Sequence, residues 1–185
     1  MRVHLVGVCG TGMGQLAMLL RDAGHEVSGS DAAFDPPMGP ALRDAGIRCL
    51  EGYDAEHVTR ALELVVVGNA IRKTNPEAAR AEELGIARAS MSATLRERFL
   101  VGRRALVVAG THGKTTTSSM CAWILNEAGL EPGFFIGGLP KNFGAGARIG
   151  RTKKSLALPP APFVVEGDEY GAVYWHKEPK FFDYV

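Results

Sequence analysis

Short apolar runs alternate with helix-spaced stretches through the first half of the chain. Residues 2–8 are mostly apolar and predict a buried strand. A helix is predicted next, because apolar residues recur at intervals of three and four positions and a glycine follows them. These positions are Leu16, Leu19, Leu20, Ala23 and Gly24. Residues 26–30 predict a second strand, with Asp31 at its carboxyl end.

The same alternation continues in shorter units. It predicts helices over residues 40–45, 55–62 and 92–99, a helix that begins near Pro76, and strands over residues 47–50, 64–67 and 86–89. Strands and helices that alternate with short links are typical of a parallel, doubly wound sheet. The pattern therefore predicts an α/β fold with a Rossmann-like parallel-sheet domain.

A second strand–loop–helix pattern begins at residue 105. Residues 105–108 predict a strand, Gly110-Thr-His-Gly-Lys-Thr follows as a loop, and the next helical pattern stops at Gly129. Along that helix Met120, Trp123, Ile124 and Ala128 share one face, and we expect Met120 and Trp123 to lie in the core. A strand over residues 163–165 ends at Glu166.

The loop before Lys114 has the composition of a phosphate-binding loop. Its free amides and the positive end of the helix dipole would both face an anion. Lys114 would reach the outer phosphates of a nucleoside triphosphate, and the Thr115 hydroxyl would ligate Mg²⁺. The strict pattern G-x-x-x-x-G-K-[ST] is not met, because Val108 occupies the position of the first glycine. His112 either contacts phosphate or shapes the loop.

An acidic cluster follows the last predicted strand. Glu166, Asp168 and Glu169 stand at its carboxyl end, where ligand sites of α/β proteins form. A carboxylate there can complete the Mg²⁺ coordination that Thr115 begins. The alternative is a solvated acidic turn.

The first glycine loop indicates a nucleotide diphosphate site. Gly10, Gly12 and Gly14 do not fit G-x-G-x-x-G, because Gln15 occupies the place of the third glycine. Asp31 nevertheless follows Gly10 at close to the roughly 20 residues expected for the acid that binds a ribose. NAD and UDP-sugar sites both use this geometry, and a glycine turn that only packs helix on sheet is the alternative.

Composition and charge restrict the partners. The chain is 46% hydrophobic and 22% charged, with a formal net charge of +1, which provides no electrostatic reason to expect nucleic acid or a membrane surface as a partner. No apolar run approaches the length of a membrane span. Cys9, Cys49 and Cys121 are odd in number and show no C-x-x-C spacing, which favours reduced thiols and a cytoplasmic location.

These motifs together resemble the Mur ligases, the ATP-dependent amide-forming enzymes of peptidoglycan synthesis. The segments that carry the resemblance are Gly7-x-x-Gly-x-Gly-Met-Gly14, Ser28-Gly-Ser-Asp31, Asn75-Pro-Glu77, Gly110-Thr-His-Gly-Lys-Thr-Thr-Thr117 and Glu166-Gly-Asp-Glu169. Within the family they are similar to ligases that act on UDP-N-acetylmuramate. The peptidoglycan-recycling branch adds a preformed L-Ala-γ-D-Glu-meso-diaminopimelate tripeptide, and another branch adds L-alanine. The details that favour the recycling branch are Gly68-Asn-Ala70, Phe134-Phe-Ile-Gly-Gly-Leu-Pro-Lys-Asn-Phe-Gly144 and Asp168-Glu-Tyr170.

The resemblance implies a mechanism and a set of site residues. The lactyl carboxylate of the sugar would attack the γ-phosphate of ATP to form an acyl phosphate, and the incoming amine would displace phosphate. Lys114 and Glu166 would be catalytic, and Thr115 and Glu166 would hold Mg²⁺. The residues implied for ATP are Gly110, Thr111, His112, Gly113, Lys114, Thr115 and Thr116. The residues implied for the UDP-sugar are Gly10, Thr11, Gly12, Met13, Gly14, Asp31 and Asn69.

The resemblance also implies a domain organisation. Residues 1–101 would form a Rossmann-like UDP-sugar-binding domain, and residues 102–185 would begin the central P-loop ATP-binding domain. The C-terminal domain that binds the amino substrate would be absent, so we expect a fragment that binds UDP-sugar without ligating. Gly167 departs from the alanine that is usual in the family, and Gly171 and Trp175-His176 depart from the recycling branch.

Three other functions remain open. The first is a UDP-N-acetylmuramate–L-alanine ligase, which differs in its amine substrate. A module that only binds UDP-sugar is the second alternative. An NAD(P)-dependent dehydrogenase is suggested by Asp31, and it is disfavoured by the loop at Gly110–Thr115, for which hydride transfer has no use.

Overall fold

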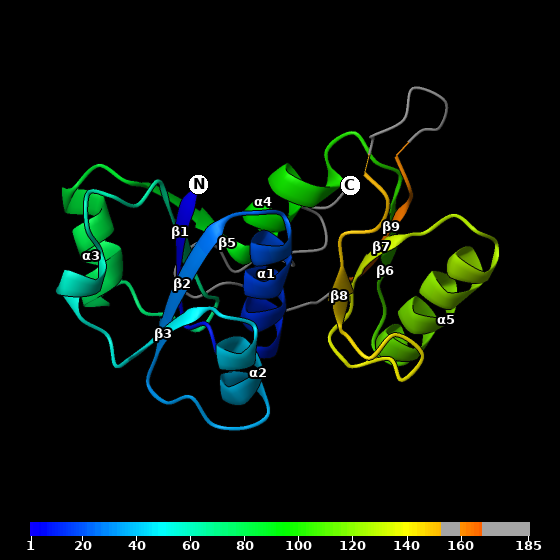
Figure 1. The fold of residues 1–185 in the computed structure, drawn as a ribbon, viewed down its shortest axis with the longest axis horizontal. Helices are drawn as coiled ribbons and strands as arrows, with labels where there is room; N and C mark the ends of the chain where they lie inside the picture. The colour runs from blue at the N-terminus through cyan, green and yellow to red at the C-terminus, as the bar shows by residue number, and fades with distance from the viewer. Residues whose placement is uncertain (153–159, 168–185) are drawn as a thin grey trace. The chain divides into compact units, whose positions relative to one another are not determined.

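The computed structural model describes residues 1–152 and 160–167. The described residues form two compact units, the first from Met1 to Thr94 and the second from Leu95 to residue 152 together with residues 160–167. Figure 1 labels the helices and strands of both units. Because each unit has its own sheet, the two are described separately.

The first unit is built on a five-stranded sheet with the order β3-β2-β1-β4-β5. Its strands are β1 (Arg2–Val6), β2 (Glu26–Asp31), β3 (Arg48–Glu51), β4 (Leu64–Val67) and β5 (Ala87–Ser90). Every pairing in the sheet is parallel, and central β1 aligns His4 with Ser28 of β2 and with Val65 of β4. The predicted parallel α/β fold is therefore confirmed.

Helices cover both faces of this sheet. Figure 1 shows α1 (Thr11–Asp22) and α2 (Met38–Asp44) on one side of the strands and α3 (Pro76–Glu83) on the other. A short helix, α4 (Met91–Leu95), follows β5. The strand order reverses direction between β1 and β4, which are adjacent in the sheet but distant in sequence. Ligands of open α/β sheets bind at the carboxyl ends of strands at such a switch point.

One predicted helix is wrong. The pattern predicts a helix over residues 55–62, but the structure has only a single 3₁₀ turn, η1 (Ala55–His57). Asp54 caps this turn by accepting a hydrogen bond from the Glu56 amide at 2.9 Å. Val58 leaves the turn with extended backbone and is buried against the apolar cluster beneath α3. Tertiary burial of Val58 therefore overrides the local helical spacing.

The second unit holds a four-stranded sheet with the order β6-β9-β7-β8. Its strands are β6 (Ala105–Val108), β7 (Gly133–Phe135), β8 (Ala147–Arg148) and β9 (Phe163–Glu166). The pairings of β9 with β6 and β7 are parallel, whereas β8 runs antiparallel to β7. A π-helical turn, η2 (Arg96–Leu100), precedes β6, and α5 (Lys114–Glu127) follows it.

The buried face of α5 differs from the predicted one. Met120 and Ile124 are 59% and 62% exposed, and Trp123 is 36% exposed, so the expectation that Met120 and Trp123 lie in the core is wrong. The helix instead buries Ser118 and Ala122. Ala122 belongs to a cluster with Phe134, Ile136 and Val164, on which Cys121 and Leu125 pack. Two stripes on α5 have helical spacing, and the stripe with smaller residues allows the closer approach to the sheet.

Among the residues that the structure describes, no helix combines the length and apolarity needed to cross a membrane.

Candidate functional site

The first glycine loop lies at the switch point of the first unit. It connects β1 to α1, and the loop that follows β4 adjoins it. Gly68 begins that second loop and donates its amide to the Val6 carbonyl at 2.9 Å. A Cβ at Gly68 would lie 2.8 Å from the same carbonyl oxygen, so the close approach of the two loops requires glycine here.

Two amide side chains near this junction have buried atoms without partners. The Oδ1 atom of Asn69 is buried and accepts no hydrogen bond. Gln15 in α1 is 3% exposed, and neither atom of its amide group has a partner. A buried polar atom without a partner costs free energy, and a ligand or water commonly satisfies it. Asn69 was predicted from sequence as a ligand-binding residue. Gln15 was not, because it was considered only as a departure from the glycine pattern.

The Asp31 carboxylate holds the first loop to the sheet. One oxygen, Oδ2, accepts a hydrogen bond from the Cys9 amide at 2.7 Å. The other, Oδ1, accepts from the Ala32 amide at 2.8 Å and from the Tyr53 hydroxyl at 3.2 Å. All three partners are donors, as an ionised carboxylate requires. Asp31 thus has a structural role within the protein, and its contact with the UDP moiety stays a prediction.

Charge and burial near Asp31 alter two neighbouring acids. Burial, and then the negative charge of Asp31, raises the pKa of the Cys9 thiol to about 11. Burial and Asp31 likewise raise the pKa of the Tyr53 hydroxyl to about 12. Both groups are therefore neutral near pH 7, which agrees with the interpretation of Cys9 as a small residue of the loop and not a nucleophile.

We expect Cys9 to be alkylated slowly by iodoacetamide. Its pKa of about 11, against an ordinary 9.0, lowers the thiolate fraction at pH 8 by about 100-fold. The rate at Cys9, followed by peptide mass spectrometry, should rise with pH until about pH 11. The same thiol in urea-unfolded chain is the control and should level off near pH 9. A native profile that also levels off near pH 9 would contradict this environment.

The second glycine loop joins β6 to α5 in the second unit. Gly113 caps α5 with a φ of +76°, a left-handed conformation that favours glycine over residues with a Cβ. The Lys114 ammonium donates to the Gly110 carbonyl at 2.7 Å, which closes the loop across four residues. Thr111, His112 and Thr116 are exposed on the same surface. The loop is therefore accessible to a ligand.

Thr115 and Glu166 meet at the end of this loop. Glu166 ends β9, which pairs with β6 so that Glu166 aligns with Val108. The Thr115 hydroxyl donates to Glu166 Oε1 at 2.7 Å, and the Gly137 amide donates to Oε2 at 2.7 Å. The structure thus brings together the two residues that were predicted to ligate Mg²⁺, from positions far apart in the sequence.

This pair fits a hard cation in chemistry. A hydroxyl and a carboxylate are oxygen ligands of the kind Mg²⁺ takes, and Mg²⁺ commonly uses one or two protein ligands together with water and phosphate oxygens. Within residues 1–152 and 160–167, no three His, Cys, Asp or Glu side chains are grouped to hold a metal alone. Asp168 and Glu169 of the predicted acidic cluster lie outside the described residues. A metal at Thr115 and Glu166 would complete its coordination with water or phosphate oxygens.

A depression of about 510 Å³ surrounds this second loop. Its lining residues are Thr111, His112, Gly113, Lys114, Thr115, Thr116, Gly137 and Glu166. Every member of the predicted ATP set except Gly110 lines it, and Gly110 contacts Lys114 directly.

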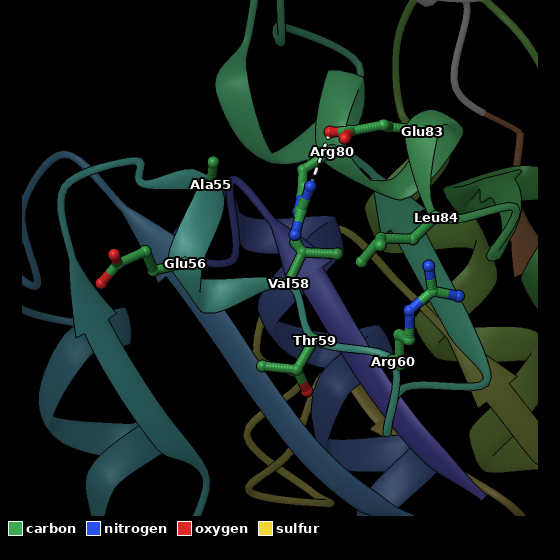
Figure 2. Close-up of a pocket in the computed structure, with 8 residues that line it drawn as sticks. All are labelled: Ala55, Glu56, Val58, Thr59, Arg60, Arg80, Glu83 and Leu84. Carbon is green, nitrogen blue, oxygen red and sulfur yellow. Dashed lines mark hydrogen bonds and ion pairs between the residues drawn. The ribbon is translucent and has the colours of Figure 1, made fainter.

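Another depression, of about 510 Å³, is lined by residues of η1 and α3 in the first unit. Figure 2 shows its lining residues. Val58 and Leu84 contribute apolar surface, and Arg80 forms an ion pair with Glu83 at 2.7 Å. No residue that was predicted to bind a ligand lines this depression. It is therefore separate from the two glycine loops.

Comparisons with known proteins show which family the chain resembles. A family model described as "Mur ligase family, catalytic domain" matches residues 2–99. A curated relative from Escherichia coli (strain K12), named UDP-N-acetylmuramate--L-alanyl-gamma-D-glutamyl-meso-2,6-diaminoheptandioate ligase, is 45% identical over 184 residues, which are 100% of this chain and 38% of the relative. A UDP-N-acetylmuramate--L-alanine ligase from Kineococcus radiotolerans is 46% identical over 171 residues, covering 91% of this chain and 34% of the relative.

A solved structure is also similar to this chain in fold. The UDP-N-acetylmuramate:L-alanyl-gamma-D-glutamyl-meso-diaminopimelate ligase from Neisseria meningitides superimposes with a TM-score of 0.90 at 42% identity, over 99% of this chain and 57% of that one. The present chain spans only part of the length of these proteins, 38% in the case of the Escherichia coli relative.

Proposed function

Because the chain belongs to the Mur ligase family, we propose that it is the nucleotide-binding part of an ATP-dependent carboxylate–amine ligase. The whole enzyme would join the lactyl carboxylate of UDP-N-acetylmuramate to the amine of L-Ala-γ-D-Glu-meso-diaminopimelate, in peptidoglycan recycling. The names of the Escherichia coli and Neisseria proteins support this substrate pair. Free thiols at Cys9, Cys49 and Cys121 support a cytoplasmic location.

We propose that residues 1–101 bind the UDP-sugar. The first glycine loop lies at the switch point of a doubly wound sheet, where nucleotides bind with their diphosphate at a helix amino terminus. Gly10 is the N-cap of α1, and Thr11, Gly12, Met13 and Gly14 form the first turn of the helix, whose amino terminus would face the diphosphate. Asp31 and Asn69 would contact the rest of the UDP moiety. The unpartnered Asn69 Oδ1 supports this assignment because a ligand would supply its missing donor.

We propose that residues 102–185 begin the ATP-binding domain. The observation that carries this proposal is the 2.7 Å hydrogen bond between the Thr115 hydroxyl and Glu166, next to Lys114 on the glycine loop. A hydroxyl and a carboxylate on one side of a phosphate loop form a place for Mg²⁺. Bound there, Mg²⁺ would neutralise charge on the transferring phosphoryl group.

The residues of this chain would contribute to formation of the acyl phosphate in three ways. Loop amides between Gly110 and Gly113 would orient the phosphates, which is the main protein contribution in phosphoryl transfer. Lys114 would leave the Gly110 carbonyl and donate to the γ-phosphate, where negative charge accumulates. Glu166 and Thr115 would both serve as ligands of the metal ion. The attacking group is the sugar carboxylate, so no side chain of the protein has to act as the nucleophile.

L-alanine is a second candidate for the amine. The Kineococcus protein named as an L-alanine ligase is 46% identical over 91% of this chain, and the Escherichia coli tripeptide ligase is 45% identical over 100% of it. Both candidates share UDP-N-acetylmuramate and ATP, so they differ only in the group that attacks the acyl phosphate.

Calorimetry with three ligands tests the proposal. We expect the chain to bind UDP-N-acetylmuramate and Mg-ATP, each without competition from the other, and to give no heat with NAD. Binding of NAD with no response to the UDP-sugar would overturn the assignment of the first loop and favour a dehydrogenase. Binding of the UDP-sugar without Mg-ATP would favour a module that only binds UDP-sugar.

A further inference from the structure

A buried carboxylate lies between α3 and the first sheet and has no part in the proposed ligand contacts. Glu77, in the first turn of α3, is 0% exposed. Its Oε2 accepts from the Ser30 hydroxyl at 2.5 Å and lies 3.4 Å from His4 Nε2. Its Oε1 lies 2.6 Å from His57 Nδ1 and accepts from the Asp54 amide at 3.3 Å. One side chain therefore connects β1, β2, η1 and α3.

The partners keep this carboxylate ionised. Burial alone raises the pKa of Glu77, but hydrogen bonds from His4, Ser30 and His57 outweigh it, so the pKa lies below the ordinary 4.5. An ionised carboxylate only accepts hydrogen bonds, so the histidine nitrogens that face it carry protons. Asn75 fixes the position of Glu77, because its Oδ1 accepts from the Glu77 amide at 2.9 Å and caps α3.

Ser30 connects Glu77 directly to the glycine loop. Its side chain donates to Glu77, and its carbonyl accepts from the Gly7 amide at 2.9 Å and the Val8 amide at 3.0 Å. The next residue, Asp31, accepts from the Cys9 amide at 2.7 Å. Three consecutive amides of the loop are therefore held by two residues at the end of β2.

A second connection runs through η1. Glu77 accepts from the Asp54 amide, and the preceding residue, Tyr53, donates its hydroxyl to Asp31 Oδ1 at 3.2 Å. Glu77 thus constrains Asp31 from both sides, through the adjacent Ser30 and through Tyr53. Asp31 Oδ2 accepts the hydrogen bond from the Cys9 amide. The position of the Asp31 carboxylate therefore fixes the position of the loop at Cys9.

We propose that Glu77 is a positioning residue for the first glycine loop. It holds Ser30 and the Tyr53–Asp54 segment so that the loop amides from Gly7 to Cys9 are ordered before a nucleotide binds. Pre-ordering of a binding loop increases affinity, because less conformational freedom is lost on binding. Only the effect on ligand affinity rests on the proposed function; the ordering of the loop does not.

Glu77→Gln is the direct test, and Glu83→Gln is its matched control. Glutamine keeps the shape of Glu77 but turns an amide NH₂ toward a group that itself donates. Glu83 lies on the same helix, where it forms an exposed ion pair with Arg80, as Figure 2 shows. Ser30→Ala removes only one donor to Glu77 and keeps the Ser30 carbonyl, so it serves if Glu77→Gln does not fold.

Amide hydrogen exchange of the ligand-free protein gives the first measurement. In Glu77→Gln we expect the Cys9 amide to exchange about tenfold faster than in the unchanged protein, the size of effect that one lost hydrogen bond to a charged group produces. The His25 amide, which donates to the Leu20 carbonyl at 3.0 Å, should not change. Equal acceleration at Cys9 and His25 would mean general destabilisation and would overturn the proposal, as would no acceleration at either.

Affinity for UDP-N-acetylmuramate gives the second measurement, at a temperature where circular dichroism shows every variant folded. We expect about tenfold weaker binding for Glu77→Gln, since less of the loop is ordered beforehand. Ser30→Ala should weaken binding by a smaller factor, and Glu83→Gln should not. Unchanged affinity in Glu77→Gln despite faster Cys9 exchange would overturn the role in binding. Absence of binding in the unchanged protein would instead count against the proposed function, and the exchange result would still decide whether Glu77 orders the loop.

Discussion

Replacing Lys114 with alanine is expected to weaken Mg-ATP binding by about 100-fold, since hydrogen bonds to charged groups are worth roughly 1.5–3 kcal/mol. Lys114 is the cation of the second glycine loop and lines the depression beside Thr115 and Glu166. In the structure its ammonium donates to the Gly110 carbonyl at 2.7 Å. Without that ammonium, the loop loses both its internal closure and its charge for the outer phosphates.

Calorimetry with Mg-ATP and with UDP-N-acetylmuramate measures this effect on the same variant. Affinity for the UDP-sugar should be unchanged, because the first glycine loop belongs to a different compact unit. Lys141→Ala is the matched control, since Lys141 is exposed and does not line the depression. Unchanged Mg-ATP affinity in Lys114→Ala would count against the phosphate-binding role of the loop.

Replacing Phe134 with alanine is expected to destabilise the second unit by about 3–5 kcal/mol, the usual cost of removing a fully buried phenylalanine ring. Phe134 lies in β7 and is 0% exposed. The Phe134 ring centroid lies 4.6 Å from the Phe143 ring centroid and 5.2 Å from the Arg148 guanidinium carbon. The substitution would leave a cavity between the sheet and α5.

Urea unfolding followed by circular dichroism measures the loss. Phe134→Leu retains most of the volume and should lose much less stability. Mg-ATP binding should weaken in Phe134→Ala as well, because β7 leads to Gly137, whose amide donates to Glu166 at 2.7 Å. A change in the free energy of unfolding below about 1 kcal/mol would show that the site collapses around the smaller side chain.

The strands of the first sheet follow from the sequence more closely than the helices do, whereas β7 and β8 of the second sheet were not predicted. Runs such as Leu64–Val67 are apolar at every position, and a short run of this kind between turn residues has few alternatives to a buried parallel strand. The prediction of a helix over residues 55–62 was wrong because the apolar spacing there is equally compatible with one turn followed by an extended segment. β8, which has only two residues, carries no periodicity that a sequence pattern would reveal.

The helix α5 shows a different limit. Its beginning is evident from Gly113 and Lys114, but its buried side is not. Met120 and Ile124 are more hydrophobic than Ser118 and Ala122, yet the smaller pair faces the sheet. Hydrophobic spacing identifies a stripe, whereas the distance available between helix and sheet selects which stripe is buried.

The amino-acid sequence by itself determined the α/β fold, the two glycine loops and the family to which their motifs belong, because strand runs and loop residues act locally. Only the tertiary structure decided that Asp31 holds the Cys9 amide and that Glu77 is buried against Ser30 and His4. It also added a direct Thr115–Glu166 hydrogen bond where the motifs predicted a shared metal. Those contacts join residues that are 22 to 73 positions apart. Strand order and register bring these residues together, and a local sequence pattern predicts neither the order nor the register.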